Sequence, residues 1–357
     1  MGPLEILDSH VHFSAVGRVA EFLRYLTAIG AERAGIVSLP DRRFVNFNPE
    51  AFAAKLGARE RLFVFGGFDY TAWFFPERKN GTPPLEAQVE RLARLGADGI
   101  KMWAGKPPFQ RELGFGLDDE VYSAAYEAAA ALSLPIVLHV ADPPEFWRTD
   151  RSRFGWSLGG ASRSSASMPT YESLQRQAET ILERHRKTLF IFPHLLFRAG
   201  DLESLSRFMG AHRNAYLDLS PGLYFYAELH RQHVRAVEFF GEFRERIIFG
   251  TDAMWFDRGH PYLPYLTVDE NVAAARRLVD FLTSAKPLEN PFAFSQEELP
   301  TLRGLALPDG VLRPIFSENF HRIVGTHPRK ADEDAIAAYG EEIASLRRSI
   351  AEAESAQ

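Results

Sequence analysis

Residues 4–13, with the sequence LEILDSHVHF, form an apolar stretch that carries two histidines two positions apart. Side chains of a β-strand alternate between its two faces, so we expect Asp8, His10 and His12 to point the same way. Two imidazoles on one face of a rigid strand can hold a single metal ion, although an isolated pair of this kind is more often unliganded. Whether this pair of histidines binds a metal ion therefore depends on where the other histidines lie in the fold.

The same stretch opens a regular alternation of strands and helices. Short apolar runs predict strands, and runs with helical spacing predict a helix after each strand. We expect strands at 4–13, 34–39, 62–68, 99–103, 135–140, 189–194, 215–219 and 247–250, and helices at 18–30, 49–60, 84–95, 118–133 with Asp118 as N-cap, 171–186, 202–212, 227–244 and 268–284.

Eight strand–helix units in succession predict an α/β fold of the (β/α)8 TIM-barrel type. An open, doubly wound sheet is the alternative, but SHVH stands where a dinucleotide-binding fold carries Gly-x-Gly-x-x-Gly. We expect the barrel to span 1–325 and to include a short helix at 317–324. Residues 326–357 are expected to form a C-terminal helical extension, with one apolar stripe that packs on the barrel or on a second subunit.

The composition of the chain limits the partners and the metal ligands that we expect. The 357 residues are 46% hydrophobic and 25% charged, and the net charge of −6 is spread without a long basic run, so we expect neither nucleic acid nor a membrane as partner. The chain has no cysteine, so a metal must be held by His, Asp, Glu or a modified Lys. Charged residues and histidines interrupt the N-terminal apolar stretch, so we expect a cytoplasmic protein rather than a secreted one. We expect it to act on a small-molecule substrate as a homo-oligomer.

Further polar residues stand at the ends of the predicted strands. His139 ends the fifth strand, His194 ends the sixth, Asp252 follows the eighth, and Lys101 lies in the fourth. In a barrel of this type the carboxyl ends of all strands face one rim, where active sites lie. These side chains should therefore converge with the two histidines of the first strand, and together they favour a functional site over isolated structural histidines.

This combination of residues predicts metal-assisted chemistry. Imidazole nitrogens and a carboxylate hold a divalent metal with a position left open for water, and such a metal generates hydroxide at neutral pH. Asp252 is placed to accept the proton of that water and to pass it to a leaving group. His194 is placed to polarise a substrate carbonyl or to orient the water.

The sequence resembles the amidohydrolase superfamily in Asp8-Ser9-His10-Val11-His12, Lys101, His139, His194 and Gly250-Thr251-Asp252. The segment 317–323, SENFHRI, is similar to the Asn-containing helix that ends amidohydrolase family 2, which includes aminocarboxymuconate-semialdehyde decarboxylase-like enzymes. The resemblance runs from Leu4 to about Gly325. It implies that His10, His12, His139 and Asp252 are metal ligands, that Asp252 is also the acid and base, and that His194 is a catalytic or second-ligand histidine.

Lys101 has several interpretations. It can be carboxylated and bridge two metal ions, it can bind a substrate carboxylate as an ammonium, or it can pair with Asp98 or another acid at the rim. A buried lysine without a partner is costly, so one of these roles is needed. We favour a single divalent metal, Zn²⁺ above others, with a second metal on a carboxylated Lys101 as the alternative.

Aromatic and basic residues suggest where a substrate binds. The loop 141–169 is long for a connection of this kind and contains Trp147 and Arg148 among other aromatic and arginine side chains. A lid that stacks a planar acid would have this composition, and so would a solvated loop anchored by aromatics. Trp103 and Trp255 are further candidates for substrate contact. We expect a small substrate that is aromatic or bears a carboxylate.

Three functions fit the predicted site. The leading hypothesis is a metal-dependent hydrolase that uses a metal-bound hydroxide on an amide, ester or lactone. The alternative is a metal-dependent non-oxidative decarboxylase, in which His194 or Asp252 delivers the proton that replaces carbon dioxide. A barrel that binds its ligand without chemistry is a third possibility, and the full set of predicted ligands argues against it.

Overall fold

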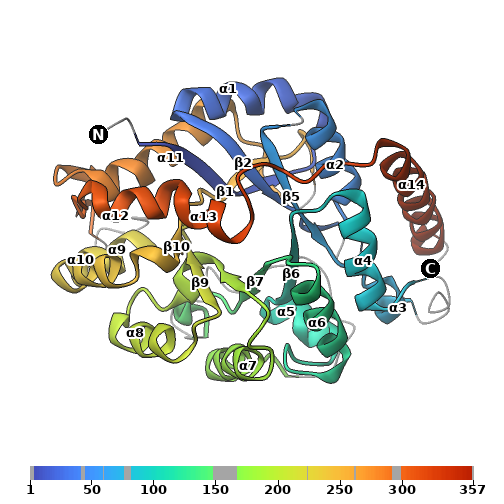
Figure 1. Ribbon diagram of the computed structural model, residues 1–357, viewed down its shortest axis with the longest axis horizontal. Coiled ribbons are helices and arrows are strands. Elements are labelled where there is room, and N and C mark those ends of the chain that lie inside the picture. The colour runs from blue at the N-terminus through green and yellow to red at the C-terminus, as the bar shows by residue number, and fades with distance from the viewer. Residues whose placement is uncertain are drawn as a thin grey trace.

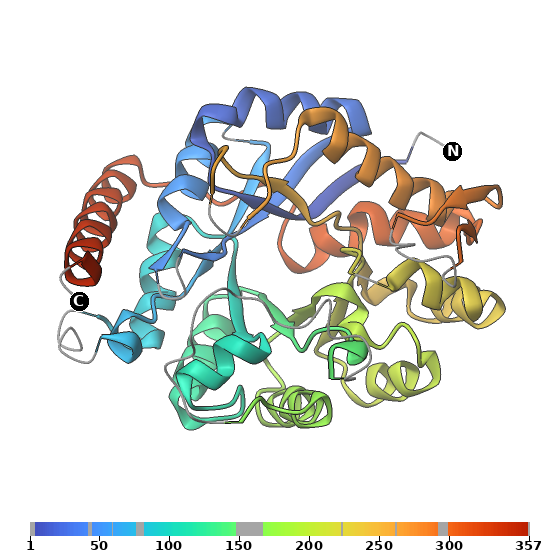
Figure 2. The same cartoon turned by 180° about the vertical axis from the view of Figure 1, so that it is seen from behind.

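Parallel strands form the centre of the molecule and helices surround them, as Figures 1 and 2 show from opposite sides. The computed structural model describes residues 4–41, 45–58, 60–75, 82–147, 167–222, 224–260, 263–291 and 299–355. The strands of the main sheet are β1 (Ile6–Phe13), β2 (Ala31–Val37), β5 (Leu62–Gly67), β6 (Gly99–Gly105), β7 (Ile136–Val140), β8 (Phe190–Phe192), β9 (Ala215–Asp218), β10 (Ile247–Ile248) and β11 (Ala253–Trp255). Their order is β10-β9-β8-β7-β6-β5-β2-β1-β11, and neighbouring strands are parallel.

The sheet closes because β10 and β11 are two parts of the last barrel strand. β10 pairs with β9, and β11 pairs with β1 on the other side. Between them, Ser9 N donates to Phe249 O at 3.0 Å and Asp252 N donates to His10 O at 2.9 Å. The predicted (β/α)8 TIM barrel is thus confirmed, and the open doubly wound sheet is excluded.

Helices and short strands complete the barrel. The helices are α1 (Val19–Ile29), α2 (Asn48–Gly57), α3 (Thr71–Phe74), α4 (Leu85–Leu95), α5 (Pro107–Leu113), α6 (Ser123–Ala131), α7 (Tyr171–Arg184), α8 (Leu202–Ala211), α9 (Phe225–Arg231), α10 (His233–Glu242), α11 (Val268–Thr283), α12 (Asp309–Arg313), α13 (Asn319–Ile323) and α14 (Glu333–Ser355). Two hairpins pair β3 (Pro40–Asp41) with β4 (Val45–Asn46) and β12 (Pro287–Glu289) with β13 (Thr301–Arg303). Within the described ranges, the structure contains no helix of the length and apolar character needed to cross a membrane.

Two predicted helices differ in detail. The helix expected at 227–244 is broken at Gln232 into α9 and α10. The helix expected from Asp118 begins instead with a short 3-10 turn, and Asp119 rather than Asp118 caps it by accepting from Val121 N. Neighbouring aspartates offer the same capping chemistry, so the choice between them depends on the local backbone.

Side-chain alternation along the strands divides the barrel interior into two layers. Toward the amino ends the interior is apolar, and Phe320 of α13 closes it with its ring 4.9 Å from that of Phe63. Toward the carboxyl ends the same faces carry polar groups, since His139 comes two residues after the interior Val137. The apolar layer thus supports the polar layer above it. Its members are Leu7, Val37, Phe63, Phe65, Val137, Ile191, Ile248 and Phe320.

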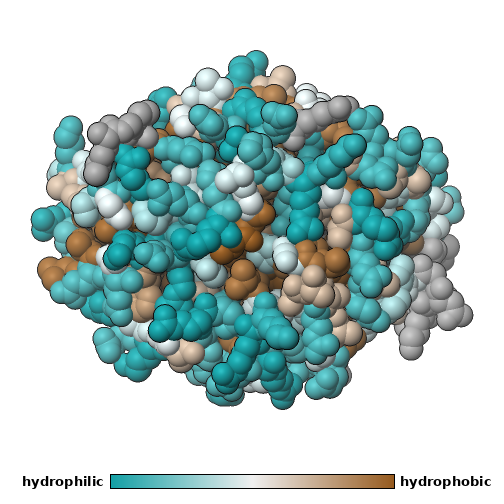
Figure 3. Space-filling view, viewed as in Figure 1, coloured by the Kyte–Doolittle hydropathy of each residue, from teal (hydrophilic) through white to brown (hydrophobic). Residues whose placement is uncertain are grey.

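The C-terminal helix α14 packs on the barrel beside α2 and α4, where Figure 1 shows it in dark red. Tyr339 OH accepts from Asn48 Nδ2 at 3.1 Å, and Arg347 forms two hydrogen bonds with Glu50 at 2.5 and 3.2 Å. Its apolar stripe is therefore covered by the barrel of the same chain. The face of the molecule shown in Figure 3 is mainly hydrophilic, with hydrophobic residues in small groups.

Candidate metal centre

The strand β1 presents His10 and His12 to the barrel interior, but Asp8 points elsewhere. Asp8 Oδ2 accepts from Tyr25 OH of α1 at 2.7 Å, on the outer side of the sheet. The β1–β2 register shifts between Asp8 and Val11, which resets the alternation of side chains. The prediction that Asp8 shares a face with the two histidines is therefore wrong.

Both imidazoles are held by their Nδ1 atoms. His10 Nδ1 lies 2.6 Å from Asp218 Oδ2, and His12 Nδ1 lies 2.9 Å from the carbonyl oxygen of Val37. These contacts direct the two Nε2 atoms toward Asp252, whose Oδ1 is 3.7 Å from His10 Nε2 and 3.0 Å from His12 Nε2. One ligand atom from each of these three residues lies within 4.8 Å of the others.

Asp252 is placed by a strained turn after β10. Its φ of +60° lies in the left-handed region, which costs free energy for a residue with a side chain. The preceding Thr251 donates to Asp8 through its backbone N at 3.0 Å and its Oγ1 at 2.6 Å. Asp8 is completely buried, and burial raises its pKa to about 6 against the opposing effect of the Thr251 and Tyr25 hydrogen bonds. The outward-facing Asp8 thus anchors the turn that carries Asp252.

The three side chains fit a divalent cation. Among the described residues, His10 Nε2 and Asp252 Oδ1 are buried without a hydrogen-bond partner, which is unusual for polar atoms in a protein interior. Burial would raise the pKa of Asp252, but contact with His12 and the charges of His12 and His10 hold it well below its usual range. Two imidazole nitrogens and an ionised carboxylate are ligands that suit zinc and its first-row neighbours.

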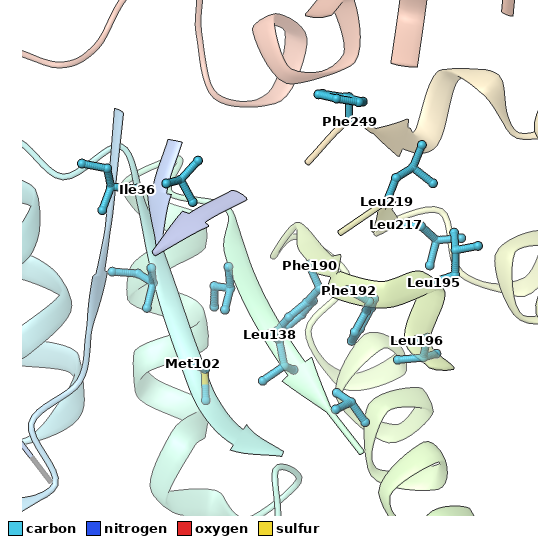
Figure 4. Packing of buried hydrophobic residues seen from close by; sticks show 14 of the residues in the cluster. Ile36, Met102, Leu138, Phe190, Phe192, Leu195, Leu196, Leu217, Leu219 and Phe249 are labelled. Carbon is cyan, nitrogen blue, oxygen red and sulfur yellow. The ribbon is translucent and has the colours of Figure 1, made fainter. Parts of the chain in front are cut away.

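His194 reaches the site from a left-handed turn after β8. Residues 194–197 all have φ between +50° and +59°, although none of them is glycine. Leu195 and Leu196 are fully buried and hold this turn; Figure 4 shows Leu195 beside Leu217. His194 Nδ1 lies 2.9 Å from the carbonyl oxygen of Ser220, and its ring centroid is 6.1 Å from that of His10. The other ring nitrogen is therefore free to face the site.

His139 lies beside this group rather than within it. Its ring centroid is 5.3 Å from that of His194, and its Nε2 atom is 3.9 Å from Asp142 Oδ1. Burial lowers the pKa of His139 to about 3, so the imidazole is neutral and able to act as a ligand. His139 is not among the residues whose ligand atoms lie within 4.8 Å of one another, and its role as a ligand stays a prediction.

Lys101 lies on β6 and is 3% exposed. Burial lowers the pKa of its ammonium to about 8, although the negative charges of Asp218 and Asp252 act in the opposite direction. Asp98 is not its partner, because Asp98 binds Lys55 at 2.6 Å at the other end of the strand. The suggested Lys101–Asp98 pair is therefore wrong, whereas carboxylation, binding of a substrate carboxylate and pairing with another acid at the rim stay predictions for Lys101.

A family model described as amidohydrolase matches residues 7–325. The chain belongs to the amidohydrolase family. No curated protein matches its sequence significantly. Amidohydrolase membership and the fold together indicate an enzyme.

Solved structures similar to this amidohydrolase share its fold at low sequence identity. One is an uncharacterised TIM-barrel protein from Bordetella bronchiseptica, with a TM-score of 0.55, 11% identity, and coverage of 90% of this chain and 99% of that one. A probable 2-pyrone-4,6-dicarboxylic acid hydrolase from Acinetobacter baumannii has a TM-score of 0.50 and 13% identity, covering 90% and 100%. The 5-carboxyvanillate decarboxylase LigW from Sphingomonas paucimobilis has the same TM-score and identity, covering 90% and 99%.

The predicted substrate-binding residues of the amidohydrolase lie in different places. Trp103 is half-buried at the carboxyl end of β6, with its ring 5.6 Å from Phe109. Trp147 donates through Nε1 to Pro169 O at 3.0 Å. Trp255 is fully buried between the side chains of Phe22 and Tyr25, so it does not reach the histidines and its expected substrate contact does not fit the structure. Arg148 and most of the predicted lid, residues 148–166, lie outside the described residues.

Sequence analysis missed Asp218, which orients His10. This aspartate ends β9 and also accepts from Ser220 N at 2.7 Å and from Ser220 Oγ at 2.5 Å. Burial would raise the pKa of Asp218, but the adjacent His10 lowers it to about 2, so the carboxylate stays ionised. A signal was present, since Ala215-Tyr216-Leu217-Asp218 places an acid at the carboxyl end of a predicted strand, as Asp252 does.

Proposed function

We propose that the protein is a zinc-dependent hydrolase that acts on an amide, ester or lactone of a small aromatic or carboxylate-bearing molecule. The observation that supports this proposal most strongly is the convergence of ligand atoms from His10, His12 and Asp252, two of which, His10 Nε2 and Asp252 Oδ1, are buried without a hydrogen-bond partner among the described residues. His139 is proposed as a further ligand. A divalent metal held by these residues would supply a water of lowered pKa and would polarise the substrate.

The chain's own residues account for the movement of protons. Asp252, ionised at neutral pH, accepts a proton from the attacking water as the water oxygen bonds to the substrate carbonyl carbon. It then gives this proton to the nitrogen or oxygen that leaves when the C–N or C–O bond breaks. His194 is proposed to orient the attacking water: its Nδ1 donates to Ser220 O, so the other ring nitrogen of the neutral imidazole accepts a hydrogen bond from the water.

A decarboxylase is the second candidate, and Lys101 favours it. In that reaction the bond to the carboxyl carbon breaks, carbon dioxide leaves, and a proton takes its place. The pKa of His194 is lowered by burial and that of Asp252 is held well below its usual range, so neither is a ready proton donor. Lys101, with a pKa of about 8, is protonated at neutral pH and lies in the interior of the barrel.

Composition supports proposals about the setting of the reaction. We propose that the protein works in the cytoplasm as a homo-oligomer and acts on a small molecule. Its net charge of −6 is spread over the chain, which argues against nucleic acid or a membrane surface as a partner. Sedimentation equilibrium of the full chain tests the oligomer, and a monomer at all concentrations would contradict it.

Metal analysis and isotope labelling test the proposed function. Protein purified without chelators should contain one zinc ion per chain, whereas two would indicate a second metal on a carboxylated Lys101. The zinc-loaded protein would then be offered aryl esters, anilides, lactones and aromatic acids in ¹⁸O-labelled water. A hydrolase incorporates ¹⁸O into the organic product, whereas a decarboxylase releases carbon dioxide and leaves its organic product without the label. Failure to bind any metal after reconstitution would overturn both candidates.

A further inference from the structure

A second charged group lies at the carboxyl ends of the strands, next to His139. Lys106 follows β6 and donates to Asp142 Oδ1, and this carboxylate follows β7 and lies 3.9 Å from His139 Nε2. The Asp142 side chain is 3% exposed, whereas that of Lys106 is 20% exposed. The pair is therefore partly buried at the rim, and the lysine is its more exposed member.

The pair is not needed to join the two strand ends. Ala141 N already donates to Gly105 O at 2.9 Å at this point of the sheet. A buried ion pair also contributes little net stability, because desolvation of the charges offsets their attraction. Another use for the two charges is therefore worth considering.

The ammonium has room for a second anion. A lysine ammonium carries three donors in different directions, and one of those of Lys106 is directed at Asp142. The partial exposure of Lys106 shows that this side chain reaches the surface of the rim. From His139, the ring of His194 is 5.3 Å away, and from there the ring of His10 is 6.1 Å away. Lys106 therefore stands at the same rim as the metal centre, with His139 and His194 between them.

We propose that Lys106 binds a substrate carboxylate remote from the reacting group, and that Asp142 orients the ammonium and weakens binding of competing anions. The substrate would then be an organic acid whose carboxylate binds at Lys106 while its reacting group lies at Asp252. This inference rests on the proposed function, because it places the reacting group at the metal centre. It differs from the roles considered for Lys101, which lies deeper in the barrel.

Two probes of one shape test the anchor by calorimetry on the zinc-loaded protein. 3-Sulfamoylbenzoate carries a carboxylate for Lys106 and a sulfonamide for the zinc, and 3-sulfamoylbenzamide replaces the carboxylate by an uncharged amide. Lys106→Met should weaken binding of the carboxylate probe about 10-fold and that of the amide probe much less, because one charge-assisted hydrogen bond is lost. Asp142→Asn should strengthen binding of the carboxylate probe several-fold, because a competing negative charge is removed.

The two variants should change the affinity in opposite directions, and this distinguishes the proposal from a purely structural role of the pair. If the pair only braces the rim, both variants should weaken both probes together, and that result would overturn the proposal. Lys187→Met, which removes an exposed lysine elsewhere, should leave both affinities unchanged. Zinc content measured on the same samples separates failure of this inference from failure of the proposed function. If zinc is bound but the two probes show no contrast, the role proposed for Lys106 is wrong and the proposed function stands. If no zinc is bound, the proposed function and the role of Lys106 are both wrong.

Discussion

The two ends of β6 each carry a lysine–aspartate pair, and the pairs differ in how deeply they are buried. At the amino end, Lys55 and Asp98 are both 1% exposed and lie 2.6 Å apart. Lys55 Nζ also donates to Gly96 O, and Asp98 also accepts from the backbone of Val64 and Arg329. At the carboxyl end, Lys106 is partly exposed and its partner Asp142 lies beside His139.

This contrast indicates that the pair at the amino end stabilises the barrel, whereas the groups at the carboxyl end are available for a functional site. The amino-end pair satisfies its donors and acceptors with backbone groups and ties residue 329, beyond the barrel, to β6. The carboxyl end instead leaves His10 Nε2, His139 Nε2 and Asp252 Oδ1 without a hydrogen-bond partner among the described residues. Residues at the carboxyl end of a TIM barrel serve function, and those at the amino end serve stability.

The largest effect is expected from Asp252→Asn at the carboxyl end. The amide cannot accept a proton and is a poorer metal ligand, so kcat should fall about 10³-fold or more with little change in thermal stability. Steady-state kinetics on the substrate found by the labelling experiment measures the loss. Asp269→Asn, on the exposed side of α11, is the matched control and should retain full activity. Retention of a tenth of the activity by the Asp252 variant would contradict the role assigned to this residue.

At the amino end, Lys55→Met should affect stability instead. The change leaves Asp98 buried without its charge partner, which costs about 3–5 kcal/mol of the free energy of unfolding. Urea unfolding at neutral pH measures this loss, and kcat of the folded fraction should not change. Lys106→Met at the carboxyl end is the comparison: it also leaves an aspartate without its charge partner, but Lys106 is partly exposed and water can take its place, so the loss should be smaller, about 1–3 kcal/mol. Equal losses in the free energy of unfolding for Lys55→Met and Lys106→Met would contradict the proposed difference between the two pairs.

Lys101 provides a test through pH, because its pKa is about 8 in the folded protein against an ordinary value of 10.5. Between these values the unfolded chain binds the proton that the folded protein has lost, so the free energy of unfolding should rise with pH by about 3 kcal/mol in total. Urea unfolding of metal-free protein from pH 7 to 10.5 measures the rise relative to Lys101→Met. Parallel curves for the two proteins would show that Lys101 is not desolvated as the structure indicates.

The fold could be predicted from the sequence because it depends on repetition. Each apolar run and each helical stripe is a local signal, and eight of them in succession leave few architectures. Breaks in regularity were not predictable. The break at Gln232, the division of the last strand around Asp252, and the register shift that turns Asp8 outward depend on contacts between distant segments.

The same distinction applies to the site. The convergence of His10, His12 and Asp252 was predictable because histidines and an acid at strand ends are visible in the sequence. The roles of their neighbours depend on geometry that the sequence does not display. The position of Trp255 after Asp252 suggested contact with the substrate, but its side chain is fully buried in the core on the outer side of the sheet. Asp218 reads as an ordinary strand-end acid, but it holds Nδ1 of His10.

Asp218→Asn tests whether orientation of a ligand matters at the carboxyl end, and we expect a smaller effect than that of Asp252→Asn. The carboxylate holds the proton of His10 on Nδ1 and leaves Nε2 free to bind a metal. An asparagine can present its NH₂ group to Nδ1, which favours the tautomer with the proton on Nε2, so zinc affinity should fall about 10- to 100-fold. Competition with a chelator of known affinity measures the change. Asp257→Asn, an exposed aspartate after β11, is the control. An unchanged affinity would mean that β1 alone orients His10, and that Asp218 serves the fold in the way that Asp98 does at the other end of the barrel.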